Sequence, residues 1–160
     1  MATPLHYASH KGHIGAIQLL IEHGVDIHKK DNEGWTPLHK ASSGGRAGAV
    51  RLLIKAGADI NTKGNTGRWT PLHNASFNGN TDAIQLLIDA GAVVNAKSAL
   101  GYTSLHRASW NGHTDAMKLL IDNGADVHEK DNYGWTPLHV ASRTGHTNAM
   151  RLLKDHGAKE

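Results

Sequence analysis

Hydrophobic residues occur along the chain in short groups with helical spacing. In one group, Ala83, Ile84 and Leu87 recur with a period of about 3.6 residues, which is typical of an amphipathic helix. Before this group, Leu72 and Ala75 stand at positions i and i+3 and predict a shorter helix with one narrow hydrophobic face. A glycine separates the two groups. The pattern therefore predicts a pair of short helices, of which the second is the more hydrophobic.

The same helix pair is predicted five times because the underlying sequence repeats. Four copies begin with Thr-Pro-Leu-His, and the fourth in chain order reads Thr103-Ser104-Leu105-His106. The first residues of the copies lie 33, 34, 33 and 33 residues apart and are Thr3, Thr36, Thr70, Thr103 and Thr136. Each copy ends at a glycine, namely Gly24, Gly57, Gly91, Gly124 and Gly157. Self-similarity at a fixed period of this length predicts a repeat architecture.

Polar residues and glycines predict where the helices begin and end. A threonine followed by proline suits a helix start, because the hydroxyl caps free N–H groups and proline lacks the N–H that would stay unpaired. The closing glycines suit the left-handed conformation that ends many helices. Thr81, Thr114 and Thr147 are predicted to cap second helices. Turn sequences at Asp31–Gly34 and Asp131–Gly134 predict projecting loops between the repeats.

This unit resembles the ankyrin repeat, whose signature is Gly-x-Thr-Pro-Leu-His-x-Ala, and the resemblance covers essentially the whole chain. It implies an all-α fold, an ankyrin-repeat solenoid of stacked helix-turn-helix units with projecting β-hairpin loops. Stacking would bury the hydrophobic face that no single unit can bury alone. We expect one domain over residues 1–160, with repeats at about 1–30, 31–63, 64–97, 98–130 and 131–160.

Composition narrows the picture only slightly. The chain has no cysteine, which excludes disulfides, thiolate zinc sites and a cysteine nucleophile. A formal charge of +3 permits an acidic partner without requiring nucleic acid. No hydrophobic stretch approaches the roughly 20 residues that span a membrane. The first residues lack the basic start and hydrophobic run of a signal peptide, so we expect an intracellular, cytoplasmic or nuclear, location.

Thirteen histidines raise the question of a metal site or an enzyme. Five of them belong to the repeated motif: His6, His39, His73, His106 and His139. Because they recur at the repeat period, each is expected to meet the same surroundings and to fix neighbouring backbone by a hydrogen bond. No HExxH motif, Ser-His-Asp set or phosphate-binding loop interrupts the periodicity. The sequence predicts no enzyme, no cofactor and no metal.

The aromatic residues carry the prediction of function. The resemblance implies binding through the loop tips and the exposed, concave side of the first helices, and most aromatic residues occupy such positions. The predicted partner-binding residues are Trp35, Trp69, Phe77, Asn78, Tyr102, Trp110, Asn111, Tyr133, Trp135, Arg68 and Arg143. Exposed aromatic side chains are typical of interface hot spots. The centre of the site is predicted over repeats 3 and 4. For the aromatic residues that precede each threonine, packing on the next loop stays open as an alternative.

One position stands apart from these contact residues. Tyr7, Lys40, Asn74, Arg107 and Val140 are equivalent residues, each following the motif histidine, and are predicted to lie away from the surface. Tyr7 is therefore the one aromatic residue predicted to lie off the contact positions. Arg107 is a weaker candidate charge contact than Arg68, because its position can face sideways.

The main hypothesis is a module that binds a partner protein or peptide, and the sequence leaves alternatives open. One is a scaffold segment of a longer array, in a pathogen effector or a regulatory subunit. Lys154, where earlier repeats have isoleucine, predicts a solvated C-terminal end, whereas Ile14 and Ile21 leave a hydrophobic N-terminal face that could self-associate. A less favoured alternative is nucleic-acid binding by a partly basic row on the second helices, formed by Gln18, Arg51, Gln85, Lys118 and Arg151.

Overall fold

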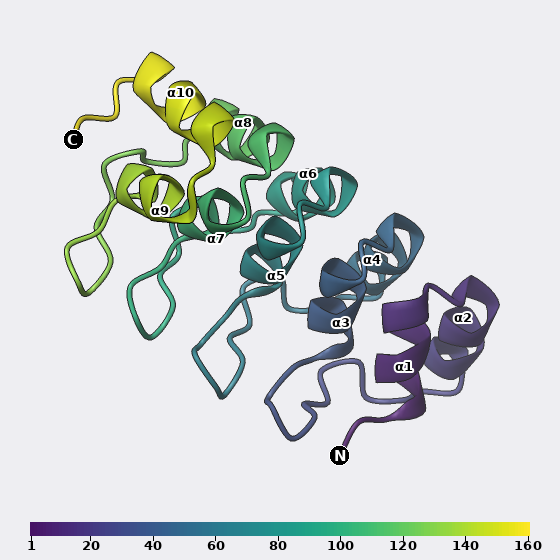
Figure 1. Ribbon diagram of the computed structural model, residues 1–160. Coiled ribbons are helices and arrows are strands. Elements are labelled where there is room, and N and C mark those ends of the chain that lie inside the picture. Colours follow the sequence, from purple (N-terminus) through teal and green to yellow (C-terminus); the bar gives the residue numbers. More distant parts are fainter.

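The computed structural model describes residues 1–160 and contains ten α-helices and no β-strand (Figure 1). In chain order the helices are α1 (Pro4–Lys11), α2 (Ile14–Glu22), α3 (Pro37–Ser43), α4 (Ala47–Lys55), α5 (Pro71–Phe77), α6 (Thr81–Asp89), α7 (Ser104–Trp110), α8 (Thr114–Asp122), α9 (Pro137–Thr144) and α10 (Thr147–Asp155). They form five consecutive pairs, called repeats 1 to 5 below, which stack side by side along a curve. The predicted all-α solenoid is confirmed.

The first helix of every repeat begins as predicted, at the motif threonine. In repeat 2, Thr36 lies in extended conformation before α3, and its side chain accepts the N–H of His39. The Thr36 N–H in turn donates to Nδ1 of His39, at 3.1 Å. Repeat 4 has the same reciprocal cap although Ser104 replaces the proline. The cap therefore depends on the threonine–histidine pair and does not need the proline.

The second helices begin differently from the prediction. Thr81, Thr114 and Thr147 are the first helical residues and not the caps, and the residue before each makes no side-chain cap. In repeat 3 this preceding residue is Asn80, whose Nδ2 donates to the carbonyl oxygens of Ser42 and Ser43 in repeat 2. The cap prediction was wrong because the side chain at the cap position bonds the neighbouring repeat.

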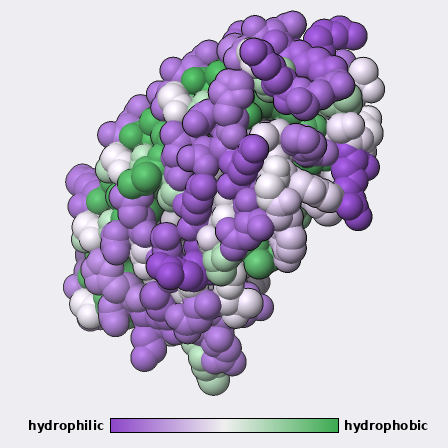
Figure 2. All heavy atoms as spheres, turned by 90° about the vertical axis from the view of Figure 1, so that its left-hand side faces the viewer, coloured by the Kyte–Doolittle hydropathy of each residue, from purple (hydrophilic) through white to green (hydrophobic).

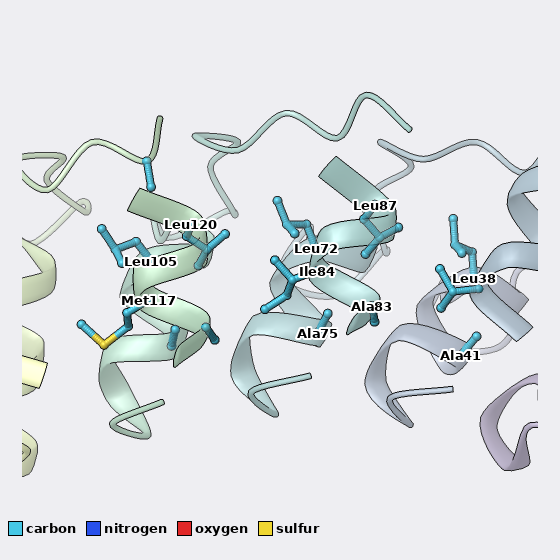
Figure 3. Packing of buried hydrophobic residues seen from close by; sticks show 14 of the residues in the cluster. Leu38, Ala41, Leu72, Ala75, Ala83, Ile84, Leu87, Leu105, Met117 and Leu120 are labelled. Carbon is cyan, nitrogen blue, oxygen red and sulfur yellow. The ribbon is translucent and has the colours of Figure 1, made fainter. Parts of the chain in front are cut away.

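The helix pairs bury hydrophobic side chains mainly against one another. Helices α1, α3, α5, α7 and α9 form an inner row next to the loops, and the second helices form an outer row (Figure 1). Leu72 of α5 points between the helices together with Ile84 and Leu87 of α6 (Figure 3), and all three are at most 1% exposed. A single cluster of 26 buried hydrophobic residues extends from Leu5 to Ala158. Stacking of neighbours thus builds one continuous core.

The motif histidines join each repeat to the next. Nε2 of His39 donates to the carbonyl oxygen of Trp69 at 2.9 Å, and Nε2 of His73 donates to that of Tyr102 at 2.9 Å. Because Nδ1 already accepts the threonine N–H, the proton must sit on Nε2 and the ring is neutral. Burial lowers the pKa of His39 and of His73 to about 4. These histidines hold neighbouring backbone, as the periodicity predicts.

The loops project beyond the inner row but form no β-ladder (Figure 1). The loop of repeat 5 is closed by a backbone bond from Asp131 N–H to the Trp135 carbonyl, at 2.9 Å. A single backbone hydrogen bond connects it to the loop of repeat 4, from the Asn132 N–H to the Leu100 carbonyl, at 3.0 Å. So few bonds make a turn and not a strand pair, which corrects the β-hairpin that the resemblance implied.

The two ends of the stack differ. Lys154 is exposed, as predicted, and its Nζ pairs with the Glu160 carboxylate at 2.7 Å. At the other end Leu19 is 56% exposed and Ile14 38% exposed. None of the ten helices has the length and hydrophobicity that crossing a membrane requires.

Candidate protein-interaction surface

Two of the predicted contact residues are strongly exposed. Trp110, the last residue of α7, is 46% exposed, and Tyr133, in the loop before α9, is 65% exposed. Trp69, Tyr102 and Trp135 are half-buried in the same part of the molecule. The surface formed by the loops and the inner row is called the inner face below. Its exposed rings have no role in the core.

Arg107 of α7 lies at the centre of a group of aromatic rings on the inner face. Its guanidinium carbon is 4.2 Å from the centroid of the Trp69 ring and 3.9 Å from that of the Phe77 ring. The Trp69 and Tyr102 rings are stacked, with centroids 6.1 Å apart and 15° between their planes. Cation–π contacts of this kind fix the position of a guanidinium. The group therefore links repeats 3 and 4.

The Arg107 side chain has no polar partner within the chain. Its Nε is buried without a hydrogen bond, and none of the three salt bridges of the protein includes it. Burial lowers the pKa of Arg107 to about 10. The side chain nevertheless stays positively charged at neutral pH. The inner face thus contains a partly desolvated cation that is held by rings alone.

One open hollow adjoins this arginine, and a second lies beside the first. The smaller, of about 170 Å³, is lined by Tyr102, His106, Arg107, Trp110 and Val140. The larger, of about 410 Å³, is lined by Tyr102, Trp110, Tyr133, Trp135 and Arg143. The second hollow is framed mainly by aromatic side chains, and the guanidinium of Arg143 lies 4.8 Å from the centroid of the Trp135 ring. Since Tyr102 and Trp110 line both hollows, the hollows are neighbours.

Other predicted contact residues are used differently. Trp35 lies in a separate hollow of about 230 Å³ between α1 and α3, together with Tyr7 and Lys40. The Asn111 amide donates to the Phe77 carbonyl, at 2.6 Å, and thereby ties α7 to α5. The Asn78 amide bonds the Asn74 carbonyl at 3.1 Å and the Ser43 hydroxyl at 3.3 Å. The two asparagines therefore support the stack.

Arg68 is exposed in the longest loop. It is the one non-glycine residue with positive φ, at 52°, which follows from its being the additional residue of that loop. Its side chain makes no salt bridge within the chain. The structure places it on a loop, as predicted, but outside the residues that line the two neighbouring hollows.

The position after the motif histidine was misjudged from the sequence. Tyr7 is 62% exposed, and Lys40 and Arg107 are half-buried on the inner face. Only Asn74 and Val140 are buried at this position. The turn of the inner helices directs the side chain at this position toward the loops, next to an aromatic residue. For Lys40, the signal that could have shown this is its spacing from Trp35 within one repeat.

In repeat 2 the cation at this position is paired. Nζ of Lys40 lies 3.0 Å from the Asp31 carboxylate and 4.5 Å from the centroid of the Trp35 ring. Burial acts to raise the pKa of Asp31, but the Trp35 amide, the hydrogen bond from Lys40 and the charge of Lys40 lower it below its ordinary value. This ion pair is complete within the chain.

The partly basic outer row is balanced by acidic residues in two of its repeats. Arg51, Lys118 and Arg151 are exposed on the second helices. One helical turn later, Asp122 follows Lys118 and Asp155 follows Arg151, whereas Arg51 is followed by Lys55. The side toward which the loops project in Figure 1 faces the viewer in Figure 2, and it is mainly hydrophilic, with hydrophobic atoms in separate small groups.

No group of three or more His, Cys, Asp or Glu side chains that could hold a metal ion occurs in the structure. Family models for ankyrin repeats match almost the entire chain. A model of three ankyrin copies matches residues 1–64 and 62–131, and a model of many copies matches residues 112–153. A comparison with curated proteins finds no match.

Proposed function

This chain belongs to the ankyrin repeat family, whose members are generally protein–protein interaction modules, and we propose that it binds a partner protein or peptide through its inner face. The centre of the proposed site is the larger hollow between repeats 4 and 5. This is one repeat closer to the C-terminus than the sequence predicts, because Phe77 of repeat 3 is covered by Arg107.

The observation that carries the proposal is the exposure of the large rings around that hollow. Trp110 is 46% exposed and Tyr133 is 65% exposed, whereas the equivalent positions to Trp110 carry His10, Ser43, Phe77 and Arg143. Stacking of the repeats therefore does not require a tryptophan there. Rigid aromatic side chains bury a large area on binding and lose little conformational entropy, which is why they dominate interface energetics.

The surroundings of these rings also suit a binding site. The inner row is held by caps and by inter-repeat bonds to backbone atoms, such as the bond from His146 Nε2 to the Trp110 carbonyl at 3.0 Å. That bond uses the backbone of Trp110 and leaves its side chain free. The scaffold is consequently rigid while the ring is available, which lowers the entropic cost of binding.

The charge pattern favours the inner face over the outer row as the binding surface. Arg107 and Arg143 lie over aromatic rings and form no salt bridge. On the outer row, in contrast, Lys118 and Arg151 are each followed one turn later by an aspartate. A surface of alternating charge gives little net attraction for a phosphate backbone.

The test is capture of a partner with the full chain as bait, followed by mass spectrometry. We expect the double variant Trp110→Ala/Tyr133→Ala to lose the partner while its melting temperature stays close to that of the wild type. Tyr7→Ala is the matched control, since it removes an equally exposed ring from the opposite end of the inner face.

Two results would contradict the proposal. In the first, the double variant still captures the same proteins. In the second, capture depends on the outer row and is lost in Arg51→Ala/Lys118→Ala instead.

A further inference from the structure

We propose that the inner face recognises a peptide segment with an acidic side chain close to a large hydrophobic one. The carboxylate would bind Arg107, and the hydrophobic side chain would occupy the larger hollow between Trp110, Tyr133 and Trp135. This inference rests on the function proposed above and specifies the chemistry of the partner.

Arg107 has hydrogen-bond donors that the chain leaves unused. A guanidinium has five N–H donors, yet here Nε is buried without a partner and no donor of the side chain bonds the rest of the chain. The rings of Trp69 and Phe77 hold it at 4.2 and 3.9 Å without satisfying these donors. Since it lines the smaller hollow, a ligand there can reach it. A carboxylate matches a guanidinium in both charge and geometry.

The charged side chains around the two hollows are positive. Arg143 lines the neighbouring hollow, and it too forms no salt bridge. Asp131, in the loop of repeat 5, is only 6% exposed and accepts the N–H groups of Tyr133 and Trp135. It therefore lies behind the loop surface and does not meet a ligand. The hollows themselves are lined by two arginines and no carboxylate, which favours an acidic segment.

The two hollows lie side by side. They share Tyr102 and Trp110, so a carboxylate at Arg107 lies next to the aromatic walls of the larger hollow. That hollow, of about 410 Å³, has room for a large side chain. In an extended peptide, side chains two positions apart point to the same side. One short segment can consequently fill both hollows.

The experiment is selection of random linear peptides on the full chain, with parallel selections on Arg107→Gln, Arg107→Met and Arg51→Gln. The Arg107→Met variant keeps a long side chain against the two rings and removes only the charge and the donors. Arg51→Gln removes an equal charge from the outer row. Enriched peptides are then synthesised with the acidic residue and with its amide, and their affinities are measured by fluorescence anisotropy.

We expect wild-type and Arg51→Gln proteins to enrich peptides with Asp or Glu near Trp, Phe or Leu. The amide peptides should bind about tenfold more weakly or worse. Arg107→Met should bind acid and amide peptides equally. Enrichment without acidic residues, or the same acid preference in Arg107→Met, would overturn the inference. Tighter binding of oligothymidylate than of any selected peptide at physiological salt would also overturn it.

The failures of the two proposals can be told apart. Peptides that need Trp110 but show no acid preference leave the proposed function standing and remove only this inference. Absence of any peptide whose binding depends on Trp110 or Tyr133 removes both.

Discussion

Repeats 2 and 4 have the same backbone but use two equivalent positions in opposite ways. In repeat 2, Asp31 and Lys40 form an ion pair of 3.0 Å over Trp35. In repeat 4 the same positions hold Ser98 and Arg107, so the cation is present and the carboxylate is missing. The cation of repeat 2 is neutralised by a carboxylate of the chain, whereas the cation of repeat 4 has no such partner.

The loops of the two repeats show why Asp31 and Ser98 can replace each other. The Asp31 carboxylate accepts the Trp35 N–H at 3.0 Å, and the Ser98 hydroxyl accepts the Tyr102 N–H at 3.1 Å. Both side chains therefore close the same turn, and an acceptor at this position does not have to carry a charge. The difference teaches that the loop residue is fixed by folding, whereas the cation opposite is free to serve binding.

The largest expected effect is on stability as a function of pH. It comes from the neutral motif histidines, which both repeats have. Burial lowers the pKa of His39 and His73 to about 4, whereas an unfolded chain binds these protons at about pH 6.5. As the pH falls from about 6.5 to 4, the unfolded state binds protons that the folded state does not bind, so the free energy of unfolding decreases. We expect a loss on the order of 3 kcal/mol per histidine, measured by urea unfolding as a function of pH.

The terminal repeat supplies the control for this prediction. His139 is exposed, and its Nε2 has no following carbonyl to bond, in contrast to Nε2 of His106, which donates to Trp135. His73→Ala should therefore flatten the pH dependence, and His139→Ala is the matched variant that removes an exposed imidazole. Equal slopes in the wild type and His73→Ala would show that the buried imidazoles do not cause the effect.

A smaller effect is expected when repeat 4 is given the charge pattern of repeat 2. Ser98→Asp places a carboxylate where Asp31 stands opposite Lys40, so that Arg107 acquires an internal partner. We expect acidic peptides selected on the wild type to bind about tenfold more weakly, because they must compete with that carboxylate. Fluorescence anisotropy measures the change.

The control for this exchange is Ser98→Asn, which has the same shape and can accept the Tyr102 N–H without a charge. It should bind the peptides as the wild type does. If Asn and Asp weaken binding equally, the loop geometry and not the charge of Arg107 determines affinity.

The smallest effect is expected in repeat 5, which has the reverse deficiency. Asp131 has a carboxylate oxygen without a partner, and Val140 stands where repeat 2 has Lys40. Val140→Lys should supply the missing cation and be about 0.5–1 kcal/mol more stable than Val140→Met, which has a similar length and no charge. The difference should shrink at high salt in urea unfolding experiments, and identical stabilities would mean that no pair forms.

Much of the fold could be predicted because its determinants are local and repeated. The threonine caps and the closing glycines depend on a few consecutive residues, and Thr36 and Gly57 behave as expected. The cap at Thr81 was predicted by the same reasoning and is wrong, because Asn80 instead bonds repeat 2. A residue's contact with the neighbouring repeat is not visible in its own segment.

The same limit applies to the candidate site. The exposed ring of Trp110 could be predicted, since its equivalents in other repeats are polar or of another size. The position of Arg107 could not, because it depends on Trp69 in the preceding repeat. Contacts between repeats, which decide whether a cation is paired, require the stacked structure.

The bond from each motif histidine has a consequence for how such a chain can change in length. In the first four repeats, Nε2 reaches a carbonyl 29 or 30 residues ahead, always in the next repeat. Removal of residues 98–130 would bring Trp135 to the place of Tyr102 in front of His73, and the bonding pattern would close again. The shortened chain would keep its architecture and lose Arg107 and Trp110. Whole units can thus be duplicated or deleted, and a recognition surface can be gained or lost without redesign of the scaffold.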